Sequence, residues 1–72
     1  MSDDKDAVIL AQSQVIGILM EVIKKLNENA VLEDEYFAIA ESGKESPRLS
    51  EILEKRQANS EIVSRLLNSL DA

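Results

Sequence analysis

The chain carries the sequence VILAQSQVIGILMEVIKKL at residues 8–26, in which a valine-isoleucine pair recurs every seven residues. The pairs are Val8-Ile9, Val15-Ile16 and Val22-Ile23, and most positions between them are also apolar. On an α-helix these side chains cover roughly half of the circumference, whereas a surface helix buries a stripe of roughly 100°. The pattern therefore predicts a helix that requires neighbours on more than one side.

The composition limits how a chain of 72 residues can supply those neighbours. A single domain of this size buries a modest share of its surface, and such domains usually depend on disulfides, a metal or oligomerisation. Cysteine and histidine are both absent, which excludes disulfides and thiolate metal sites and removes the commonest metal ligand and general base. We therefore expect no metal and no cofactor, and we expect a homodimer.

The net charge of −6 argues against nucleic acid and membranes as partners. The eight basic residues are scattered, and phosphate-backbone binding needs a concentrated basic surface. The longest uncharged run, residues 7–20, is shorter than a bilayer span, and the acidic start at residues 2–6 is unlike a signal peptide. We expect a cytoplasmic protein, either in the cell that produces it or in a host cell.

Charges and a change of phase predict two helices in the first part of the chain, over residues 3–27 and 31–42. Acidic residues open the first, and Lys24 and Lys25 lie in its last turn, as the helix dipole favours. Continuing this helix would place the next apolar side chains about 120° away from the centre of the first apolar face. No glycine or proline forces a break, so one continuous helix is the alternative.

Capping residues mark a third predicted helix over residues 47–70. Gly43 suits the end of the preceding helix, and Ser46-Pro47 is typical of an N-cap followed by the first helical position. Leucine, isoleucine and valine then recur with heptad spacing from Leu49 to Leu70.

The fold expected from these helices is all-α, in one domain over residues 1–72. It is an antiparallel hairpin of two long helices with a short connecting helix, which dimerises into a four-helix-bundle-like core. The residues expected to mediate self-association are Val8, Val15, Ile16, Leu19, Val22, Ile23, Leu26, Val63, Leu66 and Leu70.

Polar residues interrupt the apolar faces in the middle of both long helices. Arg56, Asn59 and Ser60 do so in the third helix, and Gln12 does so in the first. These side chains form a predicted polar layer that grips a partner or aligns two subunits. The alternative is that Arg56 lies along the apolar surface and reaches water, with Asn59 and Ser60 at an edge.

The segment Glu33, Asp34, Glu35, Tyr36 and Phe37 holds the candidates for binding another protein. The carboxylates can steer association with a basic surface, and aromatic side chains often anchor interfaces. The alternatives are a solvated helix face and ordinary core packing. Three consecutive acidic residues on a helix diverge over about 200°, so they are not expected to hold one metal ion.

The functional prediction is a non-enzymatic, homodimeric adaptor or inhibitor that binds another protein and modulates its activity or assembly. Bacterial and phage accessory proteins often have this size. Catalysis is not expected, because the chain lacks histidine, cysteine and a glycine-rich phosphate loop. The alternatives are an acidic mimic of nucleic acid that inhibits a DNA- or RNA-binding protein, and a structural or assembly chaperone for a partner helix. A DNA-binding helix-turn-helix is disfavoured by the weak basic charge.

Overall fold

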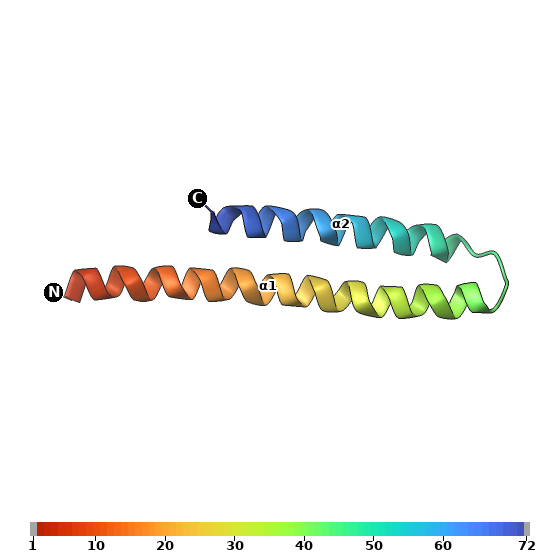
Figure 1. Cartoon of the computed structure of the whole chain (residues 1–72), viewed down its shortest axis with the longest axis horizontal. Helices are drawn as coiled ribbons and strands as arrows, with labels where there is room; N and C mark the ends of the chain where they lie inside the picture. Colours follow the sequence, from red (N-terminus) through yellow and green to blue (C-terminus); the bar gives the residue numbers. More distant parts are fainter. Residues whose placement is uncertain (1, 72) are drawn as a thin grey trace.

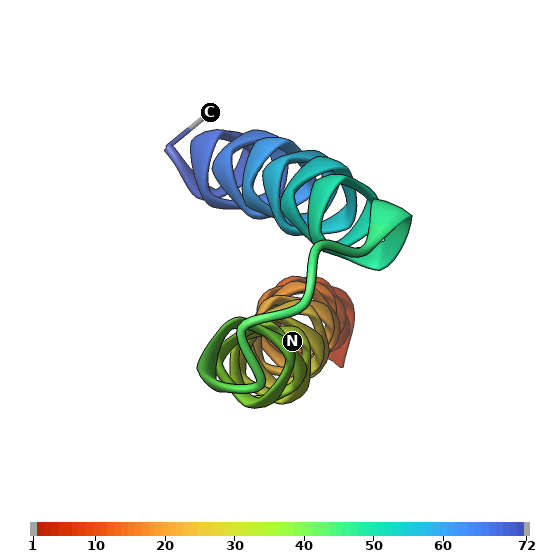
Figure 2. The ribbon, with the colours of Figure 1, turned by 90° about the vertical axis from the view of Figure 1, so that its right-hand side faces the viewer.

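The computed structural model describes residues 2–71, and within them the chain forms two helices. Helix α1 spans Ser2–Glu41 and helix α2 spans Pro47–Leu70. The two run antiparallel and are joined by a short turn, as Figures 1 and 2 show from two directions. The molecule is a thin rod with extents of 64 × 17 × 13 Å. The prediction of an all-α helical hairpin is confirmed, whereas the predicted domain limits at residues 1 and 72 lie outside the described residues.

The predicted break between residues 27 and 31 is wrong, and the short connecting helix over 31–42 is absent as a separate element. Helix α1 continues through this segment without interruption. The change of phase has another cause: α1 has two apolar faces, and the one that packs against α2 begins in the first half of the helix and continues to Ile39.

Local signals at the turn explain where the helices end and begin. Gly43 has a φ of 71°, a left-handed conformation that glycine adopts without strain, and its amide donates to the carbonyl of Ala40 (3.1 Å). Ser46 is the N-cap of α2, and its hydroxyl accepts a hydrogen bond from the amide of Arg48 (3.2 Å). Pro47 begins the helix, so the predicted start of α2 is confirmed.

The core of the hairpin is a heptad seam between the two helices. The contributing residues of α1 follow alternating steps of three and four, and all are buried or half-buried. We call this the paired face; it comprises Ile18, Val22, Lys25, Asn29, Leu32, Tyr36 and Ile39. The matching residues of α2, also buried or half-buried, are Leu49, Ile52, Arg56, Asn59, Val63, Leu66 and Leu70. Ile52 is fully buried.

Helix α2 is too short to cover all of α1. The helices contain 40 and 24 residues, and Figure 1 shows the N-terminal part of α1 projecting past the C-terminal end of α2. Every side chain over residues 4–17 is exposed, and Ile18 is the first that is half-buried. We call residues 4–17 the N-terminal extension. The hairpin therefore has arms of unequal length, and residues 4–17 of the longer arm are not covered by α2.

Candidate interaction surface

A second heptad row lies on the exposed side of α1. It steps by three and four residues from Ile9 to Ala30, and every member is exposed. We call this row the free face; it comprises Ile9, Gln12, Ile16, Leu19, Ile23, Leu26 and Ala30. Its five large apolar side chains are between 41% and 59% exposed. Because Ile23 directly follows the buried Val22, the free face and the paired face lie roughly 100° or more apart around the helix.

The residues predicted to mediate self-association divide between these two faces. Val22 is buried and Val63, Leu66 and Leu70 are half-buried, because α1 and α2 of the same chain cover them. For these four residues, the contacts within the hairpin use much of the surface that was assigned to a second copy. The other predicted members remain exposed: Val8 and Val15 on the N-terminal extension, and Ile16, Leu19, Ile23 and Leu26 on the free face.

An open groove of about 810 Å³ lies along the hairpin beside the free face. Helix α1 contributes apolar side chains from Met20 to Leu32, and α2 contributes Ala58 and Asn59. Lys24, Glu28 and Lys55 also line the groove. It is wide and shallow, with no deeply enclosed space for a small molecule, so its shape suits the side of another helix.

The polar layer forms in the structure, but with a different partner on α1. Asn59 is buried and donates from Nδ2 to Oδ1 of Asn29 (3.0 Å), and Asn29 donates to the backbone carbonyl of Arg56 (3.4 Å). Gln12 is exposed on the N-terminal extension, and Ser60 is exposed on α2. The expectation that Gln12 lies near Arg56 is therefore wrong. Because α1 is continuous, its residue 29, not residue 12, lies level with the middle of α2.

Arg56 gives a test of whether this layer aligns subunits or only the two helices of one chain. Its Nε is buried without a hydrogen-bond partner among the described residues, which costs free energy. We expect Arg56→Leu to raise the free energy of unfolding by about 1 kcal/mol and to leave the mass in solution unchanged. Thermal unfolding and light scattering measure both quantities. Arg65→Leu removes the same charge from an exposed site and serves as the control; a lower melting temperature for Arg56→Leu alone contradicts the expectation.

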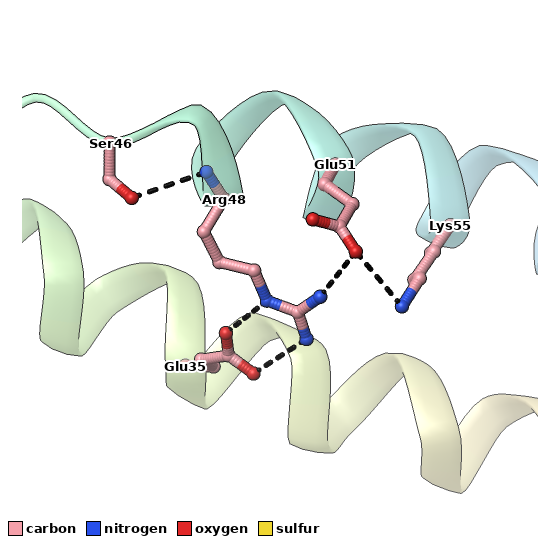
Figure 3. A network of polar contacts seen from close by, with 5 residues as sticks. All are labelled: Glu35, Ser46, Arg48, Glu51 and Lys55. Atoms are coloured by element: carbon pink, nitrogen blue, oxygen red, sulfur yellow. Dashed lines mark hydrogen bonds and ion pairs between the residues drawn. The ribbon is translucent and has the colours of Figure 1, made fainter.

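A cluster of charged side chains joins the helices near the turn (Figure 3). The Arg48 guanidinium of α2 donates to both carboxylate oxygens of Glu35 on α1, with Nη2 2.9 Å from Oε1. It also donates from Nη1 to Glu51 (2.8 Å), and Lys55 lies 3.3 Å from the same Glu51 oxygen. Two parallel hydrogen bonds between a guanidinium and a carboxylate fix the relative position of the two helices.

This geometry separates the five candidates for partner binding. Glu35 is engaged by Arg48, and Tyr36 belongs to the paired face. Glu33, Asp34 and Phe37 are exposed, and Phe37 is 54% exposed. The rings of Tyr36 and Phe37 meet edge to face, with centroids 6.1 Å apart. Three of the five therefore remain available on the surface of the hairpin.

The ion pair makes the stability of the hairpin depend on pH. The hydrogen bond from Arg48 lowers the pKa of the Glu35 carboxyl below its ordinary value of 4.5. A lowered pKa stabilises the folded state fully above the unfolded-state value, and this contribution is lost as the pH falls through the folded-state value. We expect Glu35→Gln to lower the melting temperature slightly at pH 7, because the side chain is 38% exposed and screened by solvent.

The control for this prediction is Glu33→Gln, which removes one charge from an exposed position of the same helix. Melting curves recorded by circular dichroism from pH 7 to pH 2 measure both variants. The difference in melting temperature between Glu35→Gln and the unaltered chain must disappear at the acidic end of the series, because the Glu35 carboxyl is then protonated. A difference that persists unchanged there contradicts an electrostatic origin.

Two observations bear on the expected lack of metals and of membrane partners. Within the described residues, no group of three or more acidic side chains is placed to hold a metal ion. Helix α1, over Asp4–Glu41, is long and apolar enough to cross a membrane by length and composition, with a mean hydropathy of 1.6 in its most apolar window. That window of 18 residues is longer than the uncharged run of residues 7–20 because it admits up to two charged side chains.

Comparisons of the chain with protein-family models, with curated proteins and with solved structures found no match.

Proposed function

We propose that this chain is a non-enzymatic protein-interaction module that self-associates through the free face of α1 and binds another protein. The observation that carries the proposal is the exposed heptad row from Ile9 to Leu26, which is apolar at every position except Gln12. Scattered apolar residues are normal on protein surfaces, but a contiguous apolar strip of this kind is typical of an interface. Heptad spacing indicates that the natural occupant of the strip is another helix.

Self-association is tested by the mass of the full chain in solution. One chain has a mass of 8.0 kDa, so sedimentation equilibrium should give twice that value at micromolar to millimolar concentrations. The fraction of dimer should fall on dilution while the helical content of the hairpin is retained. A particle that stays at 8.0 kDa over the whole concentration range contradicts self-association.

A chaperone for a partner helix is the second candidate, and the open groove between α1 and α2 favours it. The groove has an apolar wall from α1, and Ala58, Asn59 and Lys55 of α2 line its other side, which suits an amphipathic helix. In this function the second protein covers the groove and modulates assembly of a larger complex. Val31→Asp adds a charge to the groove outside the free face, so it should reduce capture of that protein far more than it weakens self-association.

The nucleic-acid mimic is less well supported by the geometry. Such a mimic presents a row of carboxylates that imitates phosphates, but Arg48 engages Glu35 and Lys25 pairs with Glu28 (3.5 Å). Glu33, Asp34 and Glu41 stay exposed, and with Glu35 and Glu28 engaged they do not form a continuous row of charges. Strongly salt-dependent binding to a basic protein, lost on replacing Glu33 and Asp34 with Lys, would revive this function.

A further inference from the structure

We infer that a second copy of this chain covers the free face in an antiparallel orientation, with Ile9 of one copy level with Leu26 of the other. This inference rests on the proposed self-association and adds its geometry. Three features of α1 support it: the charges that flank the free face, the register that its apolar residues allow, and the position of the N-terminal extension.

Charged residues at the two ends of the free face select the orientation. Lys5 and Glu33 occupy the same heptad column as Gln12, Leu19 and Leu26, one heptad before and one heptad after the apolar part. Both are exposed. A parallel pair would place Lys5 beside Lys5 and Glu33 beside Glu33. In the inferred antiparallel register, Lys5 is level with Ala30 and lies within one helical turn of Glu33 at both ends, and charges at a seam set orientation in this way in coiled coils.

The apolar residues then allow one favourable register. With Ile9 level with Leu26 of the second copy, Ile16 is level with Leu19, and Gln12 with Ile23. Sliding one copy by a heptad in one direction brings Ile9 against Glu33. Sliding it in the other direction brings Lys5 against Ile23 and shortens the apolar overlap. The inferred register is therefore the one in which the apolar parts of the two free faces overlap most.

The same register provides neighbours for the N-terminal extension. Residues 4–17 of one copy lie beside residues 18–31 of the other, which is the part of α1 that α2 already accompanies. Each extension then packs against a two-helix hairpin and lies next to the groove whose α1 wall runs from Met20 to Leu32. In a parallel pair, the two extensions would meet only each other. The antiparallel arrangement thus covers both unpartnered ends at once.

A lipid bilayer is the competing occupant, and the position of α2 argues against it. The part of α1 that precedes its first contact with α2, residues 4–17, is about 21 Å long at 1.5 Å per residue. The hydrocarbon core of a bilayer is about 30 Å thick. A spanning helix would therefore have to detach α2 from Ile18 and Val22, which are part of the hairpin core.

Disulfide trapping tests the orientation directly, because the chain contains no cysteine. Ile9→Cys and Leu26→Cys are made as separate variants, mixed under reducing conditions and then oxidised. We expect at least about tenfold more covalent dimer in the mixture than in either variant alone, because only the mixed pair brings the two thiols level. Ile9→Cys mixed with Glu54→Cys, on the side of α2 opposite its heptad seam, is the control and should yield little product.

The outcomes separate this inference from the proposed function. Efficient cross-linking of Ile9→Cys with itself and of Leu26→Cys with itself indicates a parallel pair and overturns the inference, while self-association stands. A chain that sediments as a monomer at all concentrations overturns both. Cosedimentation with phosphatidylcholine vesicles, together with loss of the mixed disulfide, assigns the free face to a membrane and also overturns the inference.

A charge variant gives a second measurement that needs no cysteine. Lys5→Glu should weaken the dimer roughly three- to tenfold at low salt, because it turns two attractive contacts with Glu33 into repulsive ones. Adding Glu33→Lys should restore the affinity. In a parallel pair, Lys5→Glu replaces one like-charge contact with another and should leave the affinity unchanged, which contradicts the inference. Circular dichroism of each variant verifies that the hairpin remains helical.

Discussion

We expect the Ile16→Asp variant to sediment as a monomer at concentrations where the unaltered chain is a dimer. Ile16 is 57% exposed in the hairpin and lies near the centre of the free face. Burying an isoleucine stabilises an interface by about 1.5–3 kcal/mol, and a two-fold symmetric dimer loses this contribution twice. The dissociation constant should therefore rise at least about 100-fold, since each 1.4 kcal/mol corresponds to a factor of about ten.

The control for Ile16→Asp is Ser13→Asp, which adds the same charge to the same helix but outside the free face. Both aspartates cost similar helix propensity, so a difference between the variants reports the interface. Neither site contributes to the hairpin core, because both side chains are exposed. Sedimentation at several concentrations measures the effect. An Ile16→Asp variant that remains dimeric shows that the free face is not the site of self-association.

The second large effect is expected from Ile52→Ala, which should unfold the hairpin or lower its melting temperature by at least about 10 °C. Ile52 is the fully buried side chain of the core, with 0% of its surface exposed. Truncating a buried isoleucine to alanine costs about 2–5 kcal/mol, and each kcal/mol lowers the melting temperature of a domain this small by about 4–8 °C. Two helices offer little other core to compensate for the loss.

Leu53→Ala is the matched control, because it removes the same number of carbon atoms from the next residue of α2. Leu53 is 49% exposed, so the truncation leaves no cavity in the hairpin core. Thermal unfolding followed by circular dichroism measures both variants at one protein concentration, since dimerisation adds to the apparent stability. Equal melting temperatures for the two variants would contradict the position of Ile52 in the core between α1 and α2.

The helix ends that could be predicted from the sequence are those set by interactions among a few neighbouring residues. Ser46 and Pro47 fix the start of α2 because N-cap chemistry involves only the next two or three amides, and Gly43 ends α1 because a left-handed residue favours glycine. The heptad from Leu49 to Leu70 predicted the face of α2 that meets α1, because one apolar row on a helix indicates one neighbour.

The boundaries of α1 could not be predicted because this one helix carries two heptad rows, the paired face and the free face. Leu32, Tyr36 and Ile39 belong to the paired face, whereas the centre of the first apolar face lies nearer the free face. From the sequence alone, the angle between these faces predicts a break between two helices. This error also shifted the polar layer to Gln12. Asn29 was the missed residue, and its spacing of three from Leu32 was the signal that could have revealed it.

The unequal arms of the hairpin have a kinetic consequence. The turn over residues 42–46 closes a very short loop, and the Glu35–Arg48 contacts lie just beyond it, so the first native contacts form with little loss of chain entropy. Contacts between α1 and α2 can therefore form first at the turn and then in sequence towards the two termini. Amide hydrogens beside the turn should exchange slowly, and those of the longer arm should exchange fastest until another molecule protects them.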